Sequence, residues 1–271
     1  MKAYRTRSKI IIENAGTFSS SQSVAWDDLV NTENRPQMIA SFASCSAPAP
    51  AELLAPIGSQ EVWAAGVTYF RSRDARMEES KDAGGGDFYA KVYEAERPEL
   101  FFKAPAYRVV GAGAPVRIRR DAKWNVPEPE LTLVINNRRS IVGYTIGNDM
   151  SSRDIEGENP LYLPQAKVYD GSCAIGPCVY FTENPLPPET EIQISIQRHG
   201  STIFRDSTQI RKIKRPLPEL VAYLYRETSF PTGCLLMTGT GVVPPNDLSL
   251  DHGDQIEISI APIGTLRNTV A

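Results

Sequence analysis

Short runs of apolar and β-branched residues, many of them alternating with polar ones, recur along most of the chain, and such runs predict β-strands. The alternating segment EIQISIQRHGSTIFRD at 191–206 is interrupted at His199 and Gly200, which predicts a hairpin turn there. The other clear runs are VWAAGV at 62–67, LTLVI at 131–135, IVGYTIG at 141–147, CVYFT at 178–182, CLLMTG at 234–239 and QIEISIAPIG at 255–264.

Helical patterns are few. Three segments predict helices: Ser72 to Lys81, Phe88 to Glu94, and Leu217 to Glu227, which follows Pro216. Strands and helices do not alternate regularly, as they would in a doubly wound sheet or a TIM barrel. We therefore expect a β-rich, mixed α/β fold.

The first 57 residues differ from the rest. A strand is predicted from Tyr4 to Glu13, followed by the Ser-rich stretch TFSSSQS at 17–23. The segment CSAPAPAELLAPIGSQ at 45–60 has the prolines and small residues of a linker. These features predict a small N-terminal domain and linker at 1–57 and a larger domain at 58–271.

Composition limits the class of protein. A chain of 271 residues that is 41% hydrophobic and 23% charged is typical of an enzyme or binding domain with a sizeable core. A net charge of -3 gives no basic field for nucleic acid or an anionic membrane, so neither partner is expected. With no apolar run of membrane-spanning length and no signal-peptide pattern at its start, the chain is predicted to be cytoplasmic. The four cysteines lack metal or disulfide spacing, which predicts small buried thiols.

Acidic residues gather around one predicted hairpin. Glu128 and Glu130 are two residues apart and so point to the same face of a strand. The stretch NNRRS at 136–140 predicts a turn centred near Arg138, which places Asp149 opposite residue 127 or 128. Three carboxylates at one point repel one another unless a cation lies among them, and Mg²⁺ is the usual choice. The residues alone leave open an exposed acidic strand end.

A wider set of motifs favours a metal site over an exposed acidic strand end. WAAGVTY, ELFFKAP, EPEL, IVGYTIGNDMSSRDI, KVYDGSCAIGP and TGTGVVP followed by HGDQIEI occur in an order and spacing that resemble the fumarylacetoacetate hydrolase family. The resemblance covers roughly residues 57 to 262. It implies a β-roll of mixed sheets with short helices in a catalytic domain, assembled as a homodimer or homotetramer.

The resemblance also implies the site. In this family the two strand glutamates and the aspartate of the ND motif bind Mg²⁺, Mn²⁺ or Ca²⁺, and these positions correspond to Glu128, Glu130 and Asp149. The family's active-site lysine corresponds to Lys167. The threonine of its GT motif, which binds substrate, corresponds to Thr240.

One family feature is missing. Hydrolases of the family that cleave C–C bonds carry a histidine and a glutamate that activate water, and this chain has Ser72 and Ala75 at those positions. His199 and His252 each precede a glycine in a predicted surface turn, so neither is expected to replace the dyad. Acid and base chemistry must then rest on carboxylates or lysine.

In lacking the dyad, the chain resembles one branch of the family, the 2-keto-3-deoxy-pentonate dehydratases. The strings GVTYFRSRDARMEES and KVYEAERPELFFKA carry the likeness. It implies that Glu99 is an acid/base catalyst beside Lys167. Ser72, Arg73 and Lys103 are further candidates for substrate binding, although Glu99 and Lys103 also suit a solvated loop and a sheet edge.

The expected activity follows from a metal that chelates a 2-keto acid. Chelation acidifies the C3 proton, which Glu99 or Lys167 can remove while the other protonates the departing C4 hydroxyl. The product would be 2-oxoglutarate semialdehyde plus water, as in pentose catabolism. The segment 71–87, with glycines at 84–86, would form a hinged lid or else a salt-bridged surface helix with a flexible loop. An acylpyruvate hydrolase, an oxaloacetate decarboxylase, a Schiff-base enzyme and a keto-acid sensor are the alternatives.

Overall fold

The computed structural model describes residues 1–79 and 86–271. Lys81, at the end of the first predicted helix, and two glycines of the predicted hinge, Gly84 and Gly85, lie outside the described residues.

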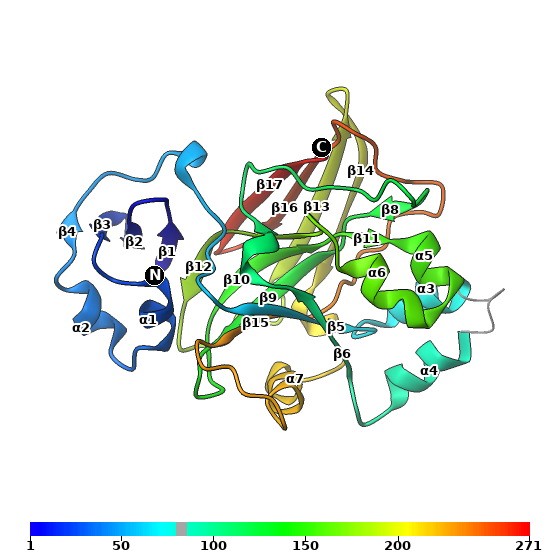
Figure 1. The fold of residues 1–271 in the computed structure, drawn as a ribbon, viewed down its shortest axis with the longest axis horizontal. Helices are drawn as coiled ribbons and strands as arrows, with labels where there is room; N and C mark the ends of the chain where they lie inside the picture. Colours follow the sequence, from blue (N-terminus) through cyan, green and yellow to red (C-terminus); the bar gives the residue numbers. More distant parts are fainter. Residues whose placement is uncertain (80–85) are drawn as a thin grey trace.

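One large sheet runs through the molecule. Among the described residues it has eleven strands, in the order β4-β3-β2-β1-β12-β10-β9-β15-β5-β6, with β7 beside β12 (Figure 1). Their bounds are β1 Lys2–Arg5, β2 Ile10–Asn14, β3 Thr17–Ser21, β4 Ala43–Ser44, β5 Glu61–Gly66, β6 Glu99–Ala104, β7 Val109–Val110, β9 Pro129–Ile135, β10 Ile141–Asp149, β12 Cys173–Phe181 and β15 Cys234–Met237.

A second sheet packs against the first. It contains β14 Ser201–Gln209, β13 Glu191–Arg198, β16 Gln255–Ile260 and β17 Gly264–Thr269, in that order. Along β13 the isoleucines at 192, 194 and 196 are buried, and they share one apolar cluster with Leu131, Leu133 and Ile146 of the large sheet. Alternation with period two therefore places the main core between the two sheets. A separate short pair joins β8 Asn125–Val126 to β11 Ser151–Ser152.

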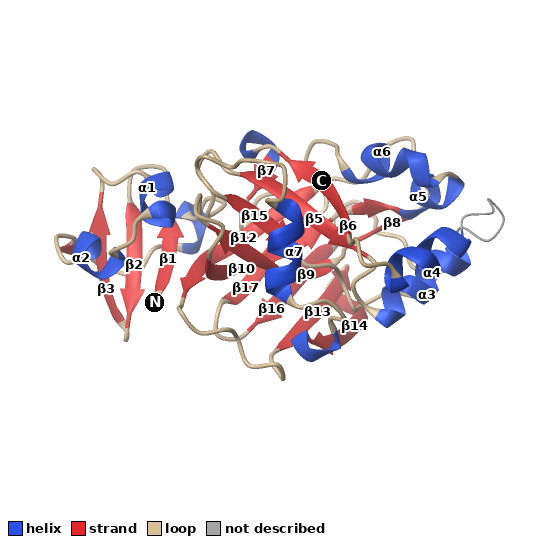
Figure 2. Ribbon diagram, turned by 90° about the horizontal axis from the view of Figure 1, so that it is seen from below, coloured by secondary structure: helices blue, strands red, loops and turns tan. Residues whose placement is uncertain are grey.

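Helices gather at the two ends of the molecule and beside the large sheet (Figure 2). Helices α3, α4, α5 and α6 lie together at the end opposite the N-terminal strands, and none of the described helices is long and apolar enough to cross a bilayer. The bounds are α1 Trp26–Asn31, α2 Arg35–Ile39, α3 Phe70–Glu79, α4 Gly86–Glu94, α5 Arg153–Glu158, α6 Leu163–Lys167 and α7 Leu217–Leu224, with short 3-10 turns at Pro50–Glu52, Ala106–Arg108, Pro160–Tyr162 and Ile210–Lys212.

A three-residue segment, 213–215, holds both ends of the α3 and α4 pair. The backbone N–H of Lys214 donates to the carbonyl of Thr68, just before α3, over 2.9 Å. The guanidinium of Arg215 donates to the carbonyls of Val92, Ala95 and Glu96, at and just beyond the end of α4, over 3.2, 2.5 and 2.9 Å. An arginine at this place satisfies carbonyls that a helix C-terminus leaves without partners.

Most sequence predictions of local structure are confirmed. Each of the seven predicted strand segments contains a strand, and the three predicted helices exist with ends shifted by a few residues. His199 and Gly200 have φ of +50° and +79°, as a tight hairpin turn requires, and His199 and His252 are exposed. The single strand predicted from Tyr4 to Glu13 is wrong. A turn in which the N–H of Thr6 donates to the carbonyl of Lys9 divides it into β1 and β2.

The N-terminal segment extends the large sheet. Strand β1 pairs antiparallel with β12, with Ala3 opposite Val179. Apolar residues of β1, β2 and α1 form a cluster with Val134, Val179 and Phe181 of the larger part. The cysteines form no disulfide, and Cys173, Cys178 and Cys234 are buried as predicted, whereas Cys45 is half-buried. The division at residue 57 stays a prediction.

Removing residues 1–57 tests that division. We expect the fragment 58–271 to lose the strand that covers the edge of β12 and to expose Val134, Val179 and Phe181. Exposing three such side chains costs about 5 kcal/mol, which lowers Tm by roughly 10 to 20 °C in a chain of this size. Thermal melts and gel filtration of the fragment, beside full-length Ala3→Asp, measure this. A fragment with the Tm and elution volume of the full chain would show that 58–271 is independent.

Candidate metal centre

Three carboxylates meet where β9 and β10 lie side by side. Glu128 directly precedes β9, Glu130 is its second residue, and Asp149 is the last residue of β10. The N–H of Asp149 donates to the carbonyl of Glu128 over 3.0 Å, so the predicted register of the hairpin is confirmed. Each of the three residues offers one carboxylate oxygen, and these oxygens lie within 4.8 Å of one another. All three side chains are buried, with at most 3% of each residue exposed.

Three cationic side chains face this acidic group. The ammonium of Lys167 donates to Glu128 Oε2 over 2.8 Å, to Asp149 Oδ2 over 2.9 Å and to Ser151 Oγ over 2.6 Å. Arg153 Nη2 lies 2.8 Å from Glu128 Oε1, and the ammonium of Lys103 contacts Asp149 Oδ1. Lys103, Lys167 and Arg153 are themselves nearly fully buried. Their charges offset the repulsion among the carboxylates.

Glu130 has the most perturbed carboxyl. Burial raises its pKa well above the usual value, and the nearby charges of Asp149 and Glu128 raise it further. The N–H of Gly239 donates to Glu130 Oε2 over 2.6 Å and favours the charged form. Gly239 has φ of +88°, and a Cβ there would lie 2.1 Å from Thr68 Oγ1, so only glycine brings this N–H to the carboxylate.

The donor set fits a hard divalent cation. The oxygens are carboxylates, all three come from the paired ends of β9 and β10 or the residue just before β9, and no histidine or cysteine takes part. Mg²⁺ binds through a few carboxylates and water, and Mn²⁺ and Ca²⁺ accept the same oxygen ligands. A cation here would also relieve the like-charge repulsion that raises the pKa of Glu130.

A small cavity opens above the carboxylates. Its walls come from the end of β5, the start of α3, β6, the β9 and β10 hairpin, α5, α6 and the loop after β15. The lining residues are Ala65, Gly66, Val67, Ser72, Phe101, Glu128, Glu130, Asp149, Arg153, Lys167, Gly239 and Thr240.

Most of the predicted site residues meet at this cavity. Ser72 and Thr240 line it beside Lys167. Ser72 Oγ donates to the carbonyl of Tyr69 over 2.8 Å, which ties it to the first turn of α3. Glu99 is half-buried and is not among the lining residues, but its Oε2 lies beside Gly66, which lines the cavity, only 2.0 Å from where a Cβ on that glycine would stand.

Two predicted substrate ligands do not reach the cavity wall. Arg73 donates to Asp74 Oδ1 over 2.7 Å, and its guanidinium lies 3.9 Å from the ring centroid of Phe70 and 5.0 Å from that of Tyr93. Lys103 is fully buried beneath Asp149 rather than on the cavity side. Their substrate roles stay untested predictions.

Sequence reasoning missed Arg153, Ser151 and Gly239. Arg153 lies four residues after Asp149 in the NDMSSRD motif, and the short helix that begins there directs its side chain back to Glu128. A cationic residue so close in sequence to a candidate metal ligand is the signal that could have identified it.

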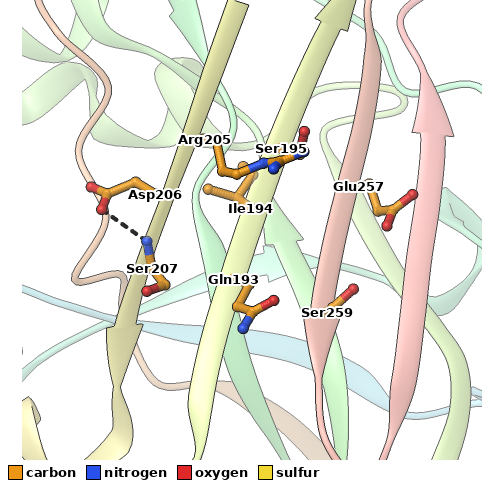
Figure 3. Close-up of a pocket in the computed structure, with 8 residues that line it drawn as sticks. All are labelled: Gln193, Ile194, Ser195, Arg205, Asp206, Ser207, Glu257 and Ser259. Atoms are coloured by element: carbon orange, nitrogen blue, oxygen red, sulfur yellow. Dashed lines mark hydrogen bonds between the residues drawn. The ribbon is translucent and has the colours of Figure 1, made fainter. Parts of the chain in front are cut away.

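A second hollow lies on the outer face of the second sheet (Figure 3). Its polar side chains come from β13, β14 and β16. Asp206 lies 2.7 Å from Arg71, and Glu257 lies 2.6 Å from Arg267, so the two carboxylates are separately paired. The buried carboxylates of the first cavity are therefore the better candidate for a functional site than this outer hollow.

Comparison with known proteins identifies the family of this chain. A sequence model described as "Fumarylacetoacetate (FAA) hydrolase C-terminal" matches residues 62–271. The probable 2-keto-3-deoxyxylonate dehydratase of Haloferax volcanii is 50% identical over 216 residues, which are 79% of this chain and 73% of that protein. The 2-dehydro-3-deoxy-D-arabinonate dehydratase of Saccharolobus solfataricus is 43% identical over 217 residues, with the same shares.

A solved structure is similar over nearly the whole length. It is that of 2-keto-3-deoxy-D-arabinonate dehydratase complexed with magnesium and 2,5-dioxopentanoate. It has a TM-score of 0.84 and 34% sequence identity, and the match covers 99% of this chain and 97% of that one. The expected fold, a β-roll of mixed sheets with short helices, is thereby confirmed.

The variant Glu130→Gln tests the metal centre. Glutamine keeps the shape and can still accept from Gly239, so the fold should persist, but the charged ligand is lost. We expect Mg²⁺ affinity to fall at least about 10- to 100-fold. Because the pKa of Glu130 is raised, the wild type should also release a proton on binding Mg²⁺, increasingly as the pH falls toward that pKa, and the variant should not. Calorimetry in two buffers of different ionisation enthalpy measures the Mg²⁺ affinity and the proton release. The exposed variant Glu191→Gln is the control. Unchanged Mg²⁺ affinity in Glu130→Gln would show that this carboxylate does not bind the cation.

Proposed function

The chain belongs to the fumarylacetoacetate hydrolase family, and from this premise we propose that it is a Mg²⁺-dependent dehydratase of a 2-keto-3-deoxy sugar acid. The substrate class is 2-keto-3-deoxy-pentonate, and the products are 2-oxoglutarate semialdehyde, which is 2,5-dioxopentanoate, and water. The observation that carries the proposal is the buried carboxylate triad facing Lys167 in a cavity without histidine. The names of the two dehydratase relatives, and the magnesium and 2,5-dioxopentanoate bound to the similar structure, support it.

A cation held by Glu128, Glu130 and Asp149 would polarise the keto group of the substrate and acidify its C3 protons. Glu99, whose Oε2 lies beside Gly66 of the cavity wall, takes a C3 proton. Lys167 donates a proton to the C4 hydroxyl, which leaves as water while the C3–C4 double bond forms. Loss of a C5 proton and protonation at C3 give an enol, and loss of its C5 hydroxyl proton with protonation at C4 gives the aldehyde. Hydrogen, carbon and oxygen balance with one water released.

The arrangement of Lys167 suits this role. Its ammonium already has three acceptors, two of them carboxylates, in a buried site where electrostatic interactions are strong. Arg153 and Thr240 line the same cavity and present donors to a carboxylate or hydroxyl of the substrate.

The hydrolytic alternatives lack their water-activating groups. Ser72 stands where C–C hydrolases of the family have histidine, and its hydroxyl is bonded to the backbone of Tyr69. Ala75 offers no carboxylate. Dehydration needs no activated water, so it agrees with the groups present.

The proposal includes a cytoplasmic homodimer or homotetramer. Large apolar side chains on the surface, Tyr107 at 80% and Leu161 at 84% exposed, are the kind of residue that an interface covers. Light scattering of the purified protein measures the assembly, and fractionation of its native cells the compartment.

Metal-stripped protein tests the reaction itself. We expect EDTA-treated protein to be inactive and Mg²⁺ to restore dehydration of 2-keto-3-deoxy-pentonates, measured as aldehyde formed from a panel of 2-keto-3-deoxy acids. Acylpyruvate and oxaloacetate should be turned over poorly, because no group activates water. Efficient cleavage of either, with no dehydration of any sugar acid, would refute the proposal.

Two variants separate the roles of Glu99 and Lys167. Glu99→Gln keeps shape but removes the base, so kcat should fall by about 10² to 10⁴ with little change in KM. Lys167→Met should raise KM and lower kcat if the ammonium also holds the substrate. Exchange of the C3 hydrogens in deuterated water, followed by NMR, isolates the first step. If Glu99→Gln exchanges the C3 hydrogens at the wild-type rate and Lys167→Met does not exchange them, then Lys167 is the base and the two roles must be reversed.

A further inference from the structure

Lys103 is a fully buried cation that the proposed reaction does not use. It is the fifth residue of β6, and its side chain has 0% exposure. Its ammonium contacts Asp149 Oδ1 and donates to the carbonyls of Met150 over 3.0 Å and Lys167 over 2.6 Å.

Two of these contacts are hydrogen bonds to backbone carbonyls, and the third is an ion pair. A lysine has three N–H donors and no acceptor, so acceptors of this kind are what its ammonium needs. Burying an ammonium is costly unless it is paired and fully hydrogen-bonded. Lys167 also has three acceptors, but all three are side-chain oxygens and Lys167 lines the cavity. Lys103 donates to two backbone carbonyls and does not line the cavity, so it is not placed to reach a substrate.

The partners of Lys103 belong to separate elements of the site. Asp149 ends β10, Met150 follows it, and Lys167 ends α6. Helix α6 has only five residues, too few to be stable by itself, so its last carbonyl needs outside donors. Ser172 Oγ also donates to the carbonyl of Lys167, over 2.9 Å. One side chain on β6 thus connects a metal-binding carboxylate to the backbone that carries the active-site lysine.

The two oxygens of Asp149 are held by different lysines. Lys103 contacts Oδ1, and Lys167 donates to Oδ2 over 2.9 Å. A carboxylate fixed through one oxygen cannot rotate freely, and its other oxygen keeps one direction. Partners of this kind behind a metal ligand typically change affinity or activity 10- to 100-fold when removed.

We propose that Lys103 is a positioning residue that orients Asp149 for the cation and fixes the backbone of Lys167 relative to it, without touching the substrate. This inference rests on the proposed metal-dependent function. A positioning role and a pure charge effect predict opposite changes in Mg²⁺ affinity when Lys103 is removed. Loss of a positive charge beside Asp149 would by electrostatics alone strengthen cation binding, whereas loss of a positioning contact weakens it.

The test is Lys103→Met, which keeps length and removes the ammonium, with exposed Lys212→Met as the matched control. Calorimetry on the metal-free protein should show Mg²⁺ binding weakened 10- to 100-fold. At saturating Mg²⁺, kcat should fall at least 10-fold while KM for the keto acid stays within about twofold. Lys103→Gln, which retains amide donors for the two carbonyls, should also weaken Mg²⁺ binding. It replaces Lys103→Met in the test if the methionine variant does not fold.

A second experiment needs no variant and is a crystal structure of the wild-type protein with Mn²⁺ and a keto acid bound. Lys103 Nζ should keep its three contacts and stay out of contact with the keto acid. A contact between them, a raised KM with unchanged Mg²⁺ affinity, or a lower Tm with unchanged affinity and kcat would each overturn the inference. Failure of the wild type to bind Mg²⁺ would instead refute the proposed function, so the two failures are distinguishable.

Discussion

Like-charge repulsion among three buried carboxylates governs how this protein is organised around its cavity. At 4.8 Å each pair of charges repels by about 3 kcal/mol at an effective dielectric constant near 20. The β9 and β10 hairpin alone would bring the three carboxylates together against this repulsion. The surrounding structure offsets it with cations that come from β6, α5 and α6.

The need for charge compensation also explains the short helices near the site. α5 has six residues and α6 has five, and neither length is stable in isolation. Each contributes one cation to the carboxylates, Arg153 from α5 and Lys167 from α6. The same ion pairs that lower the repulsion thus fix two weak elements against the rigid hairpin, so the local fold and the site depend on one another.

The features that sequence could predict are those set by local periodicity. The register of β9 and β10 follows from alternation and a single turn, and it brings Glu128, Glu130 and Asp149 together. The turn at Thr6, which makes two strands from one apolar run, has no glycine or proline to mark it. The position of Lys103 beneath Asp149 depends on three elements distant in sequence, and no spacing along the chain encodes such an arrangement.

The attachment of both ends of the α3 and α4 pair to residues 213–215 has a consequence for how such proteins diversify. The separation of the two ends is set by the scaffold, through Lys214 at one end and Arg215 at the other, and not by the chain between them. Lengthening a closed loop is cheap, about 0.6 kcal/mol for each doubling. A change in the length of the stretch between these anchors would therefore cost little and need not move the residues to which its two ends are attached.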